Sequence, residues 1–341
     1  GNVDNINKLK TLLDRHKIKY GVPNEKKDVK GYDFNSKKTK TIKLKYDNLI
    51  ITTDQIKGKM VHVLFEPQTF LSDSLTYDIT AWSLPYAYGL KALATKENIK
   101  LIKVESENYV QPKNNGIIYG WASKWNSLDD AKFLAELLNS KIKVRFNNAP
   151  LTNQSINWKR GSLFILKGDN LNFSGSDLKN KIFKIAKDNN RKITQLSSGY
   201  SSSGPDLGSD KLSLISPPRI SVLTEGNSST YNAGELIYFF EQELGYQANY
   251  VNQLRLNNEV LSKTDVLILP SGYYNFNTIK ADLISWIRNG GTLIALGRAL
   301  DALSDTDPFE ITKKESTKDK TSDTSPNSFN KRKYISNLIT G

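Results

Sequence analysis

Short apolar runs alternate with a helical pattern in the last third of the chain. Val266–Leu269 and Leu293–Leu296 are apolar runs bounded by turn residues, which is typical of strands buried on both faces of a parallel sheet. Between them, apolar residues recur at helical spacing: Ile279, Leu283, Ile284 and Ile287. Gly290 and Gly291 supply a stop for this helix. The pattern predicts a βαβ unit, and such units are almost always right-handed.

The residues before this unit predict more of the same sheet. Pro217 and Pro218 mark a boundary, and they are followed by a predicted strand, helix and strand at Arg219–Thr224, Gly234–Leu244 and Gln247–Val251. Because ligands bind beyond the carboxyl ends of parallel strands, we expect a binding crevice in the loops that follow them. Its predicted residues are Gly226, Ser271, Gly272, Tyr273, Tyr274, Gly297 and Arg298.

The first two thirds of the chain also alternate between helical and strand patterns, which predicts an N-terminal α/β domain over 2–215. Helices are predicted at Asn5–His16, at Asp129–Leu138 with Ser127 as cap and Ala131, Leu134 and Leu138 on one face, and at Leu178–Asp188. Strands are predicted within Thr39–Thr53 and at Val61–Pro67, Ile142–Phe146 and Gly161–Leu166. The Ser- and Gly-rich stretch Gln195–Asp210 predicts a flexible loop or an interdomain link.

Aromatic and acidic residues concentrate between Leu71 and Leu90. We expect a subset of them to line a groove, because amphipathic aromatic side chains suit contacts with sugars or peptides. This subset consists of Asp73, Tyr77, Asp78, Trp82 and Tyr86. The other interpretation is a helix start capped by Ser72 or Asp73, with its aromatic side chains packed between domains.

The amino-acid composition limits the kinds of chemistry that this chain can perform. A chain of 341 residues is long enough for two domains, because single cores rarely grow past about 250–300 residues. It contains no cysteine, which excludes disulfides and thiolate chemistry, and its two histidines are His16 and His62. His62 and Glu66 are four residues apart, but a zincin helix requires a second histidine. We therefore predict no metal site and no catalytic residue.

The formal net charge is +13, and it comes mainly from lysines spread along the chain. Nucleic-acid recognition tends to concentrate Arg and Lys on one face among aromatic residues. The pattern here predicts a solvated surface and no nucleic-acid partner, although attraction to an acidic surface stays open. No apolar run approaches the roughly 20 residues that cross a bilayer, so no membrane span is predicted.

Several segments together resemble the region that follows the catalytic domain in large bacterial zinc carboxypeptidases. They are Leu64–Pro67, Asp73–Tyr86, Gly204–Ser209 and Gly234–Glu241. The resemblance implies a peptidase domain upstream of this chain as partner, a zinc ion in that domain only, and a secreted or periplasmic location. Those enzymes bind zinc through a His-x-x-Glu pair, which is absent here because Lys19 and Phe65 stand three residues after the histidines.

The order of predicted elements after Pro218 resembles the flavodoxin-like, class I glutamine amidotransferase-like fold over 216–341. In active members a Gly-x-Cys-x-Gly elbow carries the nucleophile, but Gly297 occupies the cysteine position and no histidine lies downstream. Ser271 could replace the nucleophile only with an adjacent base, which the sequence does not supply. The charged stretch 304–333 predicts a mobile loop, and the apolar residues after it indicate a sheet that continues past Gly341.

These observations predict a non-catalytic accessory region that scaffolds the peptidase or binds its substrate. The alternative is a glycan- or peptide-binding module that acts independently and uses the aromatic segment or the crevice. A weaker third hypothesis is a metal-free hydrolase around Ser271.

Overall fold

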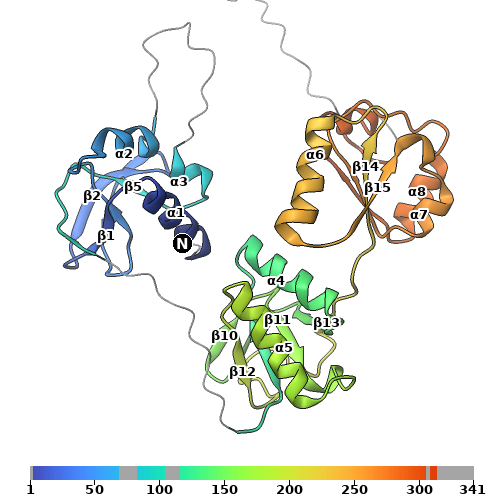
Figure 1. Cartoon of the computed structure of the whole chain (residues 1–341), viewed down its shortest axis with the longest axis horizontal. Helices are drawn as coiled ribbons and strands as arrows, with labels where there is room; N and C mark the ends of the chain where they lie inside the picture. Colours follow the sequence, from blue (N-terminus) through green and yellow to red (C-terminus); the bar gives the residue numbers. More distant parts are fainter. Residues whose placement is uncertain (1–2, 69–82, 104–115, 305–307, 313–341) are drawn as a thin grey trace, which may run out of the picture. The chain divides into compact units, whose positions relative to one another are not determined.

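The computed structural model describes residues 3–68, 83–103, 116–304 and 308–312. The chain divides into two compact units. Of the described residues, 3–68 and 83–103 belong to the first unit, and 116–304 and 308–312 belong to the second. Mixed helices and strands, including one parallel sheet, confirm the α/β class (Figure 1). The boundary expected at 215/216 lies between two sheets of the second unit.

The first unit packs helices against two small antiparallel sheets, ordered β4-β1-β6 and β3-β2-β5. Its helices are α1 Val3–Arg15, α2 Gly58–Phe65 and α3 Leu84–Ala87. Its strands are β1 Tyr20–Pro23, β2 Asp28–Asp33, β3 Lys38–Lys43, β4 Ile50–Ile51, β5 Leu93–Ala94 and β6 Leu101–Ile102. Helix α1 confirms the predicted amphipathic helix, because Leu9 and Leu13 are buried on one face.

The strand predicted at Val61–Pro67 is wrong, since these residues belong mostly to helix α2. In a strand, Val61 and Val63 would share one face, yet Val61 is buried and Val63 is 54% exposed. The side chains that pack into the core have helical spacing: Met60, Val61, Leu64 and Phe65. A short apolar run does not distinguish these two structures by its pattern, and the tertiary contacts decide.

Asp33, at the end of β2, carries a perturbed carboxyl. Hydrogen bonds from the Ser36 hydroxyl (2.5 Å) and the Lys40 ammonium (2.9 Å) lower the pKa of Asp33 to about 2. This pKa lies below the usual unfolded value of about 3.9, so the ionised carboxylate stabilises the folded unit above about pH 4. That contribution is lost as the pH falls toward 2.

We expect Asp33→Asn to make the first unit less sensitive to acid than the wild type between about pH 4 and pH 2, because the titrating carboxylate is gone. Urea unfolding at a series of pH values measures this slope. Asp47→Asn, at an exposed aspartate, is the matched control and should keep the wild-type slope. An unchanged slope in Asp33→Asn would contradict the assignment.

The second unit begins with a five-stranded antiparallel sheet ordered β12-β7-β11-β8-β13. These strands are β7 Gly120–Ser123, β8 Arg145–Asn147, β11 Leu163–Leu166, β12 Thr194–Leu196 and β13 Leu212–Leu214. Helices α4 Leu128–Asn139 and α5 Gly175–Asp188 pack together into one core cluster with Trp121, Leu163 and Ile165 of the sheet. Residues of the hairpin formed by β9 Leu151–Asn153 and β10 Ile156–Trp158 pack into a second core cluster. A 3-10 turn spans Lys167–Asp169 after β11.

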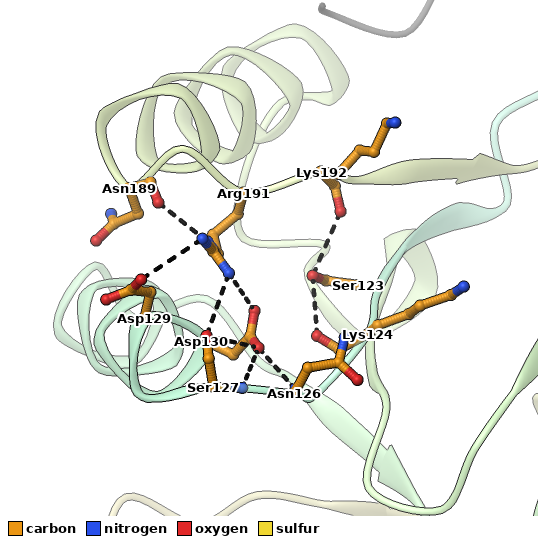
Figure 2. A network of polar contacts seen from close by, with 9 residues as sticks. All are labelled: Ser123, Lys124, Asn126, Ser127, Asp129, Asp130, Asn189, Arg191 and Lys192. Carbon is orange, nitrogen blue, oxygen red and sulfur yellow. Dashed lines mark hydrogen bonds and ion pairs between the residues drawn. The ribbon is translucent and has the colours of Figure 1, made fainter. Parts of the chain in front are cut away.

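A buried ion pair joins the two helices (Figure 2). Arg191, which follows α5, donates from Nη1 to Oδ1 of Asp130 in the first turn of α4 at 3.1 Å. Asp129 lies 3.8 Å from the same guanidinium. Asp130 also accepts from the backbone N–H groups of Asn126 and Ser127. The bond with Ser127, the predicted cap residue, belongs to a capping box. The contacts are internal and identify this network as a structural clamp.

Two expectations for this region are corrected. Helix α4 buries Leu138 as predicted, but Ala131 and Leu134 are only half-buried. Its other buried residues include Phe133 and Leu137, so the buried face is rotated from the predicted one. The Ser- and Gly-rich stretch is neither a free loop nor a link between domains. Its Leu207 is fully buried, and Ser201–Ser203 bond to β9 and to Asp206.

The second unit ends with a parallel sheet ordered β15-β14-β16-β17. The strands are β14 Ile220–Glu225, β15 Ala248–Asn252, β16 Val266–Leu269 and β17 Thr292–Ala295. The helices are α6 Thr230–Tyr238 with a π-helical turn Phe239–Leu244, α7 Asn258–Ser262 and α8 Lys280–Arg288, with 3-10 turns at Gln253–Arg255 and Gly297–Ala302. Helix α6 covers one face, and α7 and α8 cover the other (Figure 1).

The predicted βαβ unit is present as β16, α8 and β17. Strand β16 is largely buried on both faces, as expected. Strand β17, in contrast, is not buried on both faces. It lies at the edge of the described sheet, and its Ile294 is 40% exposed. The predicted charged loop 304–333 falls mainly outside the described residues.

Candidate functional site

Two loops meet at the carboxyl ends of β14 and β16. Ser228 and Gly272 form an antiparallel bridge. On either side, the N–H of Ser229 donates to the carbonyl of Ser271 (2.8 Å), and the N–H of Tyr273 donates to the carbonyl of Asn227 (3.0 Å). A Cβ on Gly272 would lie 2.5 Å from the Asn227 carbonyl oxygen, so only glycine permits this approach. The base of the predicted crevice is therefore closed by backbone hydrogen bonds.

Tyr274, predicted as a binding residue of the crevice, belongs to the core beneath these loops. Its side chain is 8% exposed, and its ring stacks on Phe276 at 5.7 Å. The hydroxyl lies 2.8 Å from the Ser228 hydroxyl and donates to the Pro270 carbonyl at 2.9 Å. Burial raises the pKa of Tyr274, and the bond with Ser228 partly offsets this shift. Tyr274 thus helps to hold the two loops together.

Tyr273 and Arg298 form the accessible part of the site. Tyr273 is 64% exposed, and the Arg298 guanidinium carbon lies 5.3 Å from the centre of its ring, a cation–π contact. Within the described residues, no carboxylate forms an ion pair with Arg298. The pair presents a flat aromatic surface beside a cation, which can contact planar or anionic groups.

Ser271 and Gly297 lie together behind this pair. The hydroxyl of Ser271 accepts a hydrogen bond from the backbone N–H of Arg298 at 3.2 Å. Gly297 has a φ of +57°, and a Cβ there would lie 3.0 Å from the Ser271 hydroxyl oxygen. A side chain at position 297 would therefore be strained and would crowd Ser271. Gly226 lies exposed in the loop after β14, with a φ of +78°.

The structure describes only one residue of the predicted aromatic groove. Tyr86 lies in α3, is 43% exposed, and donates to the Phe34 carbonyl at 3.2 Å. Its ring packs on Phe34 at 5.3 Å, so this side chain contacts its own unit. The other predicted groove residues fall outside the described residues: Asp73, Tyr77, Asp78 and Trp82.

Metal ligation was not predicted, and the described part of the chain contains no group of three or more metal-ligating side chains. Nε2 of His62 on α2 lies 3.7 Å from Oε2 of Glu66, the residue after this helix. None of the described helices is long and apolar enough to cross a membrane.

A cavity of about 580 Å³ that sequence reasoning did not locate opens at the other end of the parallel sheet. It lies beside the amino ends of β14 and β15, where Pro218, Arg219 and Tyr246 contribute to the lining. Arg219 is paired with both carboxylate oxygens of Asp265, and the Tyr246 hydroxyl donates to the Pro218 carbonyl. In the sequence, the only feature that marked the position of this cavity was the diproline Pro217–Pro218, which was interpreted as a domain boundary.

Comparison of the chain with protein-family models, with curated proteins and with solved structures gives no match.

Proposed function

We propose that this chain is a non-catalytic accessory region that binds or positions the substrate of a zinc carboxypeptidase-like protein. The observation that carries the proposal is the turn after β17. Gly297 stands where an amidotransferase-like protein has its nucleophile, and an added Cβ there would lie 3.0 Å from the Ser271 hydroxyl oxygen. The second unit contains no histidine, so neither a cysteine nor a serine nucleophile has an imidazole base there.

The strand order supports the amidotransferase-like part of this proposal. Numbered along the chain, the order β15-β14-β16-β17 is 2-1-3-4, which equals the first four strands of the flavodoxin-like order. In such sheets the ligand site lies where the order reverses, between the first and third strands. Here that position is occupied by the bonded loops after β14 and β16, with Tyr273 and Arg298 at the surface.

The alternative, a glycan- or peptide-binding module that acts independently, is favoured by the same exposed pair. An aromatic ring beside a guanidinium suits the face of a sugar ring or the carboxylate of a peptide. The two proposals differ in the partner. The accessory region requires a domain with His-x-x-Glu and a later histidine in the same open reading frame, and the module does not.

Glycan and peptide arrays should yield ligands whose binding is weakened about fivefold or more by Arg298→Ala and by Tyr273→Ala, because anchors of this kind contribute more than about 1 kcal/mol. The matched controls Arg255→Ala and Tyr231→Ala change exposed residues of the same types in the same unit and should leave binding unchanged. Mass spectrometry of peptides incubated with the chain and zinc should show no cleavage. Turnover, or a fluorophosphonate label on Ser271, would overturn the proposal.

A further inference from the structure

Two large aromatic side chains lie exposed on one side of α6. Tyr231 is 86% exposed and Tyr238 is 59% exposed. They are seven residues apart, which places them on the same side of the helix and about 10 Å apart along its axis. The opposite side packs against the sheet through Leu236 and Phe240. The two tyrosines therefore lie on the outward side of α6, away from the core of their unit.

Gly234 lies between these tyrosines, in the interior of the nine-residue helix α6. Glycine is the least favourable residue in a helix interior after proline, so its presence lowers the stability of this helix. Its φ is not positive, and a Cβ at this position would meet no described atom within 4 Å. Neither the backbone nor the packing of the described residues therefore requires glycine here. The missing side chain does allow the backbone of another molecule to approach closely.

Glu235 adds a carboxylate to the same side of α6. It follows Tyr231 by four residues and precedes Tyr238 by three, so all three side chains are neighbours on the helix surface. Its carboxylate accepts a bond from the Asn232 amide at 3.3 Å and, within the described ranges, pairs with no lysine or arginine. We call Tyr231, Gly234, Glu235 and Tyr238 the tyrosine face.

The segment that carries the tyrosine face differs in charge from the rest of the chain. The whole chain has a net charge of +13, yet no lysine or arginine occurs between Ile220 and Leu254. The charged residues in this range are Glu225, Glu235, Glu241 and Glu243. A lysine or arginine from another molecule can pair with a carboxylate here and can also lie over a tyrosine ring. Charge complementarity therefore favours a basic partner.

A continuation of the parallel sheet does not cover this face. A further strand would pair with the edge of β17, and a further helix would pack on a face of the sheet. The tyrosine face lies on the outward side of α6, away from both places. Its exposure therefore does not depend on an unpaired sheet edge.

We propose that the tyrosine face docks a segment of a partner protein that is rich in lysine and arginine. Cationic side chains of the segment pair with Glu235 and lie over the two tyrosine rings, and its backbone passes close to Gly234. The inference is independent of the proposed function. Arg298 beside Tyr273 suits an anionic group, whereas the tyrosine face suits a cationic one, so the two surfaces take ligands of opposite charge.

The test uses the whole chain and a fluorescein-labelled peptide, Lys-Arg-Ala-Lys-Arg-Ala-Lys-Arg, followed by fluorescence anisotropy. The net charge of the chain opposes a general attraction of this basic peptide. We expect saturable binding that Glu235→Lys weakens about tenfold, because the substitution reverses the charge between the two tyrosines. The matched control Glu259→Lys makes the same change at an exposed glutamate of α7 and should bind like the wild type.

Gly234→Gln separates docking from folding. It should raise the urea midpoint of the second unit, because glutamine favours a helix over glycine. It should nevertheless weaken peptide binding about fivefold or more, because the added side chain occupies the space that the peptide backbone approaches. The matched control Gly208→Gln adds the same side chain at an exposed glycine with open surroundings and should bind like the wild type.

No saturable binding up to about 1 mM peptide would overturn the inference, as would equal binding by the wild type and Glu235→Lys. Unchanged binding by a folded Gly234→Gln would overturn it as well, because the glycine would then have no part in docking. If Gly234→Gln fails to fold by circular dichroism, Glu235→Lys against Glu259→Lys decides. Self-association that Glu235→Lys abolishes, without peptide binding, would assign the face to a second copy and refute the proposal.

Discussion

Arg191→Ala should destabilise the second unit by about 3–5 kcal/mol, because it leaves the Asp130 carboxylate buried without its counter-charge. Asp130 is 2% exposed and Arg191 is 7% exposed, so water cannot replace the lost guanidinium. The loss also separates the start of α4 from the end of α5, which the pair holds together. Both charges lie at the helix ends that favour them, the carboxylate at an amino end and the guanidinium at a carboxyl end.

Urea unfolding followed by tryptophan fluorescence measures this effect, since every tryptophan except Trp82 lies within Tyr109–Lys318. Lys184→Ala is the control, because it breaks the exposed pair of Lys184 with Asp188 on α5 and should change stability far less than Arg191→Ala. Asp130→Asn with Arg191 intact should also destabilise. A loss below about 1 kcal/mol in Arg191→Ala would show that the clamp does not support the helix pair.

The parallel sheet could be predicted from local sequence because its signals are local. Val266–Leu269 is apolar at each position and is bounded by Asp265 and Pro270, so a strand buried on both faces is its simplest interpretation. The helix before Gly290 shows its inward face as a 3.6-residue period. Neither signal depends on which distant residue provides the contact, and both elements are present as β16 and α8.

The sequence-based predictions fail where contacts between residues far apart in the sequence determine the structure. The pattern at Val61–Phe65 suits a strand as well as a helix, and the choice is made by packing against α1 and its neighbours. Ser and Gly at 197–204 predict flexibility, yet Asn153 bonds to the carbonyls of Ser198 and Tyr200 from another hairpin. Nothing within the Ser- and Gly-rich stretch itself encodes these bonds.

The sequence predicts where a crevice would lie, but it does not distinguish which of its residues are exposed. The rule that ligands lie beyond the carboxyl ends of parallel strands places the crevice in the loops after β14, β16 and β17. It cannot distinguish Tyr273 from Tyr274, which are adjacent in sequence but 64% and 8% exposed. That difference follows from the bridge between Ser228 and Gly272, which turns Tyr274 inward to its hydroxyl partners.

Trp158→Ala should cost about 3–5 kcal/mol in the second unit, because it opens a cavity beneath the Ser- and Gly-rich stretch. Trp158 is 1% exposed, packs on Phe164 at 5.7 Å and shares its cluster with Leu207. Urea unfolding gives the free energy. Hydrogen exchange at the Leu207 amide, which bonds to the Gly199 carbonyl, shows whether the stretch opens with the loss of the ring.

Trp125→Ala is the matched control, since it removes the same side chain from a site that is 42% exposed and should change stability by about 0.5 kcal/mol or less. Equal effects of the two substitutions would mean that Trp158 does not anchor the stretch. Faster exchange at Leu207 in Trp158→Ala alone would show that residues with the composition of a linker are held in place by one aromatic side chain from a neighbouring hairpin. In that case the order of this segment depends on burial, because its own sequence favours flexibility.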